Sequence, residues 1–187
     1  MKKLLALFIC FFTFIGSNPS FGEEKPEYLE QVYLTEKQAV DLVFKDLKVE
    51  KKQFSITPEQ KNNVQKRLKR KIKETNFSYY VGKKGNENER YAWVLDEQGK
   101  HFPMTFIVSI NKNLVVEQVA IMVYREKKGD EVKRKRFLNQ FIKKSVSDPI
   151  EVDNDIIHIT GATISSWSIS AGVKKALVLT DELLKNK

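Results

Sequence analysis

The alternation of apolar and polar residues in the middle of the chain predicts a β-sheet. Four runs rich in β-branched and aromatic residues occupy residues 77–81, 91–95, 105–110 and 114–124, with short polar turns between them. Such runs are typical of an antiparallel meander. A break in the alternation between Glu117 and Ala120 predicts a β-bulge in the last strand. Pro103 lies at the start of the third strand, where the absence of a backbone N–H is tolerated.

Apolar residues at helical spacing predict two helices before the sheet and two after it. Thr35 and Thr57 each precede a glutamine by three residues, and Pro58 follows the second threonine, so both threonines are expected to cap helices. The expected apolar faces are Ala39, Leu42, Val43 and Leu47; Val64, Leu68 and Ile72; Val132, Phe137, Leu138, Phe141 and Ile142; and Ile169, Val173, Ala176, Leu177 and Leu184. The pattern predicts an α+β fold: an antiparallel sheet with leader helices, a connecting helix and a C-terminal helix.

The N-terminus has the composition of a secretory signal peptide. Basic Lys2 and Lys3 precede an apolar stretch, residues 4–16, and small polar residues lead to an expected cleavage after Gly22. We therefore expect an exported protein, periplasmic or on the extracytoplasmic face of the membrane, with residues 23–187 forming one domain. Residues 23–75 are its helical leader region and residues 76–187 carry the sheet. Because the single cysteine, Cys10, lies in the signal, disulfides, Fe–S clusters and thiol nucleophiles are excluded.

The net positive charge of the chain limits the classes of partner that it is expected to bind. Removing Lys2 and Lys3 lowers the formal charge from +9 to +7, which favours anionic lipid surfaces, acidic proteins or phosphate-bearing ligands, and export argues against nucleic acid. The basic run at residues 66–73 is either a solvent-exposed helix face or a docking surface. Two histidines without metal-ligand spacing, and no G-x-S-x-G or glycine-rich nucleotide loop, leave no predicted metal site or catalytic residue.

The most informative stretch lies before the C-terminal helix. The β-branched residues 156–159 predict a short buried strand, and Thr160, Gly161, Ala162 and Thr163 then form a strand-to-helix turn. The first turn of a helix has unpaired N–H groups and the positive end of the dipole, so it attracts phosphate. Gly161 and Ala162 allow close approach of a ligand. The alternative is simple N-capping by Thr160 or Thr163. The available hydroxyls belong to Thr160, Thr163, Ser165 and Ser166.

The residues Thr160, Gly161, Ala162, Thr163 and Ser165 resemble the flavinylation motif of the FMN-binding domain family. Relatives in that family include the C subunit of the sodium-pumping NADH:quinone reductase and the G subunit of Rnf complexes. The resemblance implies that Thr163 carries FMN through a phosphoester, attached by a flavin transferase that uses FAD. Residues 91–93, 96–97, 124–126 and 136–141 resemble the family's sheet and connecting helix, and 35–39 and 57–60 its leader helices. Where the family usually has Asp, this chain has Ile157.

This resemblance implies an exported FMN-binding electron carrier rather than a stand-alone enzyme. Its expected partners are the flavin transferase, a membrane-associated redox partner and an anionic membrane surface. Trp167, one turn after Thr163, either stacks on the flavin or packs into the core under the helix. Two alternatives remain: a cofactor-free module that docks through residues 66–73 and 133–136, and a small flavin reductase that binds FMN without the ester.

Overall fold

The protein is described by a computed structural model that covers residues 28–185, so the predicted signal peptide lies outside the described residues. Its elements, in chain order, are β1 (Gln31–Val32), α1 (Glu36–Phe44), β2 (Lys48–Ser55), α2 (Pro58–Leu68), β3 (Asn76–Lys84), β4 (Glu87–Gln98), β5 (Pro103–Asn111), β6 (Val116–Tyr124), the 3-10 turn η1 (Asp130–Lys133), α3 (Lys135–Leu138), the 3-10 turn η2 (Asn139–Phe141) and α4 (Thr163–Lys185). The six strands form one antiparallel sheet in the order β1-β6-β5-β4-β3-β2, which confirms the α+β prediction.

The predicted meander corresponds to β3–β6, but β2 was not predicted. β2 pairs with β3 along its whole length at the edge of the sheet. Its lysines and glutamate give it no apolar alternation, because most of its side chains face solvent. The expected bulge is present, since the register between β5 and β6 shifts where Ser109 pairs with Gln118 and Ile110 pairs with Val116, leaving Glu117 out of the ladder. Pro103 is the first residue of β5, as expected.

The capping boxes of α1 and α2 are confirmed. The side chains of Thr35 and Thr57 accept hydrogen bonds from the backbone N–H groups of Gln38 and Gln60. Helix α2 ends earlier than predicted, because Lys69 adopts a left-handed conformation with φ 52°, so Ile72 follows the helix. The predicted connecting helix is broken into η1, α3 and η2, with extended backbone at Arg134 between the first two.

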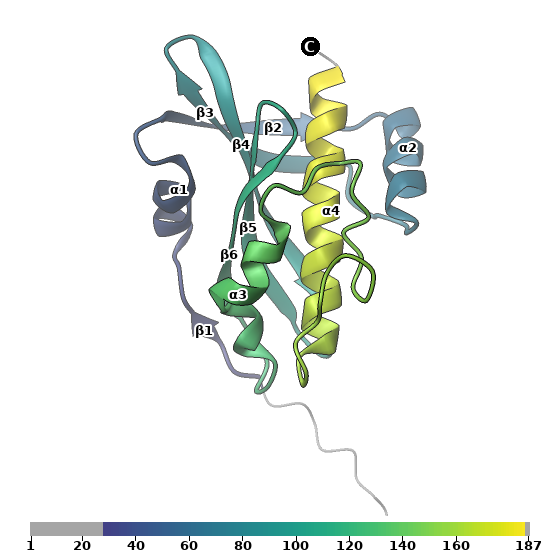
Figure 1. Cartoon of the computed structure of the whole chain (residues 1–187). Coiled ribbons are helices and arrows are strands. Elements are labelled where there is room, and N and C mark those ends of the chain that lie inside the picture. The colour runs from purple at the N-terminus through teal and green to yellow at the C-terminus, as the bar shows by residue number, and fades with distance from the viewer. Residues whose placement is uncertain (1–27, 186–187) are drawn as a thin grey trace, which may run out of the picture.

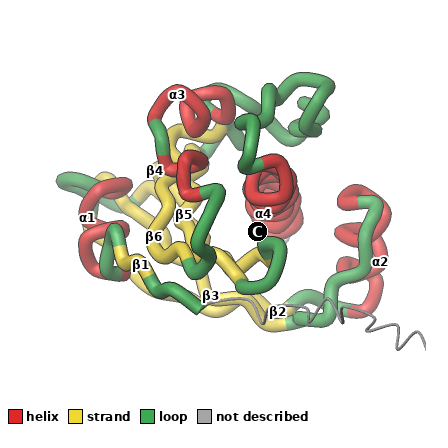
Figure 2. The backbone as a smooth tube through the Cα atoms, turned by 90° about the horizontal axis from the view of Figure 1, so that it is seen from below, coloured by secondary structure: helices red, strands yellow, loops and turns green. Residues whose placement is uncertain are grey.

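The sheet separates two apolar layers. Helix α4 covers one face and α1 covers the other, while α2 packs on the outer side of α4 (Figures 1 and 2). The larger core lies under α4 around Trp93, whose indole N–H donates to Thr180 Oγ1 over 2.8 Å. Within residues 28–185, no helix combines the length and apolar composition required to span a bilayer. Helix α4 packs against α2, β4 and β5, and its first turn lies at the lower end of the molecule in Figure 1.

Candidate functional site

The segment before α4 is not the predicted buried strand. Only Ile156 forms a bridge, to Val152, and Ile157 is 77% exposed. The backbone of Ile157 is instead paired with the Gln140 side chain, whose Nε2 donates to Ile157 O over 3.0 Å and whose Oε1 accepts from Ile157 N over 2.8 Å. A side-chain amide thus replaces a neighbouring strand, and the sequence pattern did not reveal this pairing.

The motif forms a tight turn followed directly by the helix. Ala162 N–H donates to Ile159 O over 2.9 Å, and Gly161 has φ 85°, which favours glycine at this point of the turn. Ala162 is the N-cap, because its carbonyl accepts the first helical bond, and Thr163 is the first helical residue. An alanine cannot cap a helix with its side chain. The side-chain hydrogen bonds to backbone atoms described at the start of α4 involve Ile159 N, Ala162 O and Ile164 O, and none has a first-turn N–H group of α4 as its donor.

The four hydroxyls of the motif divide into two pairs. Thr160 and Thr163 are exposed, whereas Ser165 and Ser166 are buried. Ser165 Oγ lies 2.9 Å from the Tyr124 hydroxyl, and Ser166 Oγ donates to Ala162 O over 3.0 Å. The buried serines therefore hold the turn and the helix start in place, and Thr160 and Thr163 are the hydroxyls that a ligand can reach.

Residues 124–129, at the end of β6 and in the connection that follows it, pack against the start of α4. The Tyr124 hydroxyl donates to Lys128 O over 2.7 Å, and burial raises the pKa of Tyr124, so this proton is retained. Gly129 has φ 94°, and a Cβ there would lie 2.6 Å from the Tyr124 oxygen and 3.1 Å from Ser165 Oγ. A side chain at this position would push the connection away from the helix. No local sequence pattern marks Tyr124 and Gly129 as site residues, because only the fold brings them to the motif.

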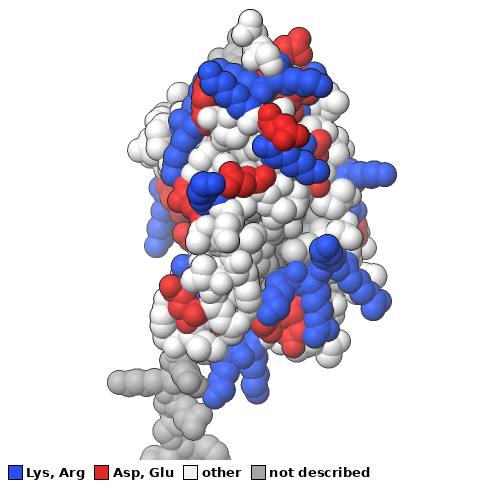
Figure 3. Space-filling model, turned by 90° about the vertical axis from the view of Figure 1, so that its left-hand side faces the viewer, with Lys and Arg blue, Asp and Glu red and all other residues white. Residues whose placement is uncertain are grey.

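Two hollows flank the turn, and both carry positive charge. One, of about 300 Å³, includes Lys100 and Lys128, and also Glu126, beside Thr163. The other, of about 500 Å³, includes Arg134 and Arg136 beside Thr160. None of these four basic side chains forms an ion pair with another described residue, and Figure 3 shows basic side chains gathered near α3. The surroundings of Thr160 and Thr163 therefore favour an anionic ligand.

Asp155 organises the loop that leads to the motif. Its carboxylate accepts from Lys144 Nζ over 2.7 Å and from the backbone N–H groups of Ile150 and Glu151 over 3.2 and 2.8 Å. Burial acts to raise the pKa of Asp155, but the hydrogen bonds from Lys144 and the two N–H groups outweigh it and leave the pKa below its ordinary value. The ionised carboxylate thus stabilises this loop.

The variant Asp155→Asn is expected to lower the free energy of unfolding by about 1.5–3 kcal/mol at pH 7, because charge-assisted hydrogen bonds are lost. Since the folded pKa is depressed, the contribution of Asp155 is complete above the ordinary carboxyl pKa of about 4 and is lost as pH falls through the lowered value. Urea unfolding at pH 7 and pH 3 measures both effects, with exposed Asp46→Asn as control. Equal acid sensitivity of Asp155→Asn and the unmodified protein would contradict this prediction.

Trp167 does not pack into the core. Its side chain is 57% exposed and borders a hollow between α2, residues 149–152 and α4. This excludes the core alternative for Trp167. The residue follows Thr163 by one helical turn, so both lie on the same side of α4.

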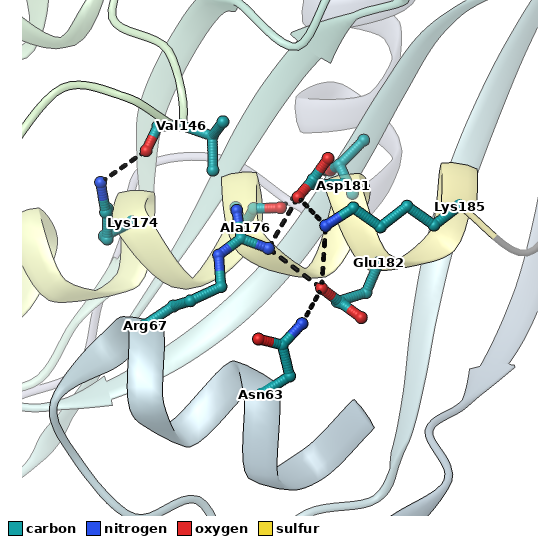
Figure 4. A network of polar contacts seen from close by, with 9 residues as sticks. Asn63, Arg67, Val146, Lys174, Ala176, Asp181, Glu182 and Lys185 are labelled. Carbon is teal, nitrogen blue, oxygen red and sulfur yellow. Dashed lines mark hydrogen bonds and ion pairs between the residues drawn. The ribbon is translucent and has the colours of Figure 1, made fainter. Parts of the chain in front are cut away.

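The basic run at residues 66–73 is only partly a solvent-exposed face. Arg67 forms ion pairs with Asp181 over 2.7 Å and with Glu182 over 3.0 Å, joining α2 to α4 (Figure 4). Arg70 binds Glu97 through both terminal nitrogens, each over 2.7 Å. Lys66, Lys71 and Lys73 remain exposed. The two arginines therefore connect α2 to the rest of the domain.

Comparison with known proteins gives a family match for the part of the chain that carries the motif. Residues 99–178 match the profile of a family described as the FMN-binding domain, a stretch that includes β5, β6 and the whole Thr160–Thr163 turn. The fold resembles the crystal structure of NqrC from Shewanella oneidensis with a TM-score of 0.51 and 13% identity, over 76% of this chain and 87% of that chain. No curated protein matches the sequence. Residues 99–178 therefore match the FMN-binding domain family, and this match supports FMN as the cofactor.

Proposed function

We propose that this protein is an exported electron-transfer flavoprotein whose FMN is attached through a phosphoester to Thr163. The observation that carries the proposal is the position of the Thr163 hydroxyl. It is exposed at the first residue of a 23-residue helix whose N-cap residue, Ala162, has no side chain that can accept a hydrogen bond. The same chain caps α1 and α2 with threonine and glutamine, whereas the short elements η1, α3 and η2 have no side-chain cap.

The residues around Thr163 fit a phosphodiester. The free N–H groups and the positive end of the α4 dipole favour its negative charge. Ala162 keeps bulk away, and a Cβ built on Gly161 would meet no atom within 4 Å, so the approach is open. Lys100 and Lys128 add positive charge from the neighbouring hollow. Phosphate at this place would satisfy the N–H groups that a capping residue satisfies in other helices.

Ile157, which stands where the family usually has Asp, is compatible with this proposal. Its side chain points to solvent, and its backbone is fixed by Gln140. The conformation of the turn therefore does not depend on a carboxylate at position 157. Any effect of Ile157 is expected on recognition by the flavin transferase rather than on folding.

Electron transfer is the function that these features support best. FMN supplies the redox chemistry, and the protein contributes binding and electrostatics. A covalent link suits an exported protein, because a dissociating cofactor would be lost by dilution. The expected partners are the flavin transferase and a membrane-associated redox partner, with anionic lipid as a further contact.

A second candidate is a cofactor-free module that docks to an anionic membrane surface or an acidic protein. The observation in its favour is the exposed stretch Arg134, Lys135 and Arg136, which forms no ion pair with the described part of the chain. Such unpaired basic side chains favour anionic surfaces.

Coexpression of the full chain with a flavin transferase tests the proposal. The purified protein should fluoresce on a denaturing gel, gain the mass of one FMN minus one water, and occur in the exported fraction. Cells without the transferase provide the baseline. Flavin that leaves on denaturation would favour the non-covalent reductase. A colourless, unmodified protein beside an active transferase would overturn the carrier proposal and favour the docking module.

A further inference from the structure

A pocket of about 290 Å³ lies between the end of α2 and the middle of α4, at the lower limit of the ~300–1,000 Å³ that small-molecule sites occupy. We call it the α2–α4 pocket. It is lined by Arg67, Leu68, Lys69 and Arg70, by Pro149, Ile150, Glu151 and Val152, and by Trp167, Ser170, Ala171 and Lys174. The lining combines apolar side chains with basic ones, so the pocket suits a flat apolar ring with polar edges.

Ser170 supplies a polar group without a partner in this pocket. The residue is 3% exposed, and its Oγ forms no hydrogen bond with the described part of the chain. A buried hydroxyl left unsatisfied costs about 1–3 kcal/mol. The other such hydroxyl, that of Ser109, lies on β5 and does not line the pocket. A ligand with an acceptor atom in the α2–α4 pocket would satisfy Ser170.

The basic residues of the pocket are held in place by their neighbours. Glu97 holds Arg70, while Asp181 and Glu182 hold Arg67 (Figure 4). Lys174 Nζ donates to Val146 O over 2.8 Å and also to Asp148 O. Burial lowers the pKa of Lys174, and the nearby Arg67 charge lowers it further. The wall is thus preorganised, which reduces the entropy lost on binding.

The pocket continues the helix face on which Thr163 lies. Trp167 is four residues after Thr163 and Ser170 seven, so they stand about 6 and about 10 Å further along the axis. Residues at these spacings share one side of a helix. The five-carbon ribityl chain of FMN separates phosphate from ring by more than one helical turn, which is about 5.4 Å. A ring tethered at Thr163 can therefore reach Trp167 and the pocket.

We propose that the isoalloxazine ring of FMN attached at Thr163 seats in the α2–α4 pocket, against Trp167 and within hydrogen-bonding reach of the Ser170 hydroxyl. This inference rests on the proposed covalent attachment and adds the place of the ring. The exposed indole of Trp167 offers a flat face, and Ser170 donates to a ring carbonyl oxygen. Helix α2, which lies outside the matched segment 99–178, supplies one wall.

Fluorescence of the flavinylated full-length protein tests the ring position. A tryptophan in contact with a flavin quenches its emission, so Trp167→Leu should raise flavin fluorescence several-fold. Trp93 is fully buried in the core and remains as an internal control for folding. Ile164→Ala, which removes an exposed side chain of the same turn beside the Thr163 hollow, is the matched control and should leave the emission unchanged.

Ser170→Ala provides a second, independent measurement. In the apoprotein it should leave stability unchanged or raise it, because it removes an unsatisfied hydroxyl. In the flavinylated protein it should reduce the stabilisation gained on flavinylation and shift the flavin absorption bands. Unchanged emission in Trp167→Leu and unchanged spectra in Ser170→Ala, with the full mass of FMN present, would overturn the ring position alone. Absence of the FMN mass would overturn the proposed function itself.

Discussion

Replacement of Thr163 by alanine is expected to abolish covalent FMN completely. The Thr163 hydroxyl provides the oxygen of the proposed phosphoester, and no other motif hydroxyl occupies the same place at the helix start. Because Thr163 is exposed, the substitution should change the free energy of unfolding by less than about 0.5 kcal/mol. Loss of label would then report chemistry rather than misfolding. Denaturing-gel fluorescence and intact mass after coexpression with the transferase provide the measurement.

Thr160→Ala is the matched control for Thr163→Ala. Thr160 is also an exposed threonine of the same turn, but it precedes Gly161 and Ala162 and lies outside the helix. Its variant should still yield the FMN mass on a tryptic peptide that contains Thr163. A label that persists in Thr163→Ala and disappears in Thr160→Ala would show that FMN is attached to Thr160, and it would contradict our proposal.

Glu97→Ala is expected to destabilise the domain by about 3–5 kcal/mol, the range for breaking a buried ion pair from one side. Glu97 is 7% exposed and binds Arg70 with two hydrogen bonds, while Lys175 Nζ lies 3.6 Å from its Oε1. Lys175 is itself only 6% exposed, so removal of the carboxylate leaves a buried positive charge. Arg70 would also lose its fixed position on the α2–α4 pocket.

Urea unfolding followed by circular dichroism measures the effect of Glu97→Ala. Asp41→Ala is the control, since it removes an ion pair with Lys37 whose side chains are 62% and 85% exposed, and it should cost less than about 1 kcal/mol. Adding Lys175→Met to Glu97→Ala should recover part of the loss, because the unpaired buried charge is removed. Equal losses in the single and double variants would show that the buried lysine is not the cause.

The sequence by itself determined those strands and helix starts that depend on contacts between residues close together in the chain. Period-two alternation predicted β3–β6, and the two Thr–Gln spacings predicted the starts of α1 and α2, because capping is a contact between residues three positions apart. The order of residues from Thr160 to Ser165 also placed the FMN-binding-like motif at the start of the last helix. The motif is recognised from the order of its residues alone, whatever residues surround it in the fold.

Only the tertiary structure decided which of these groups are available. Ser165 and Ser166 face inward because Tyr124 and the turn itself take up their hydroxyls, while Gln140 replaces the strand expected beside Ile157. The polar strand β2 gains its place from pairing with β3, not from its own pattern. The α2–α4 pocket brings residues 67–70 to Trp167. These contacts join residues far apart in the chain, so no local pattern contains them.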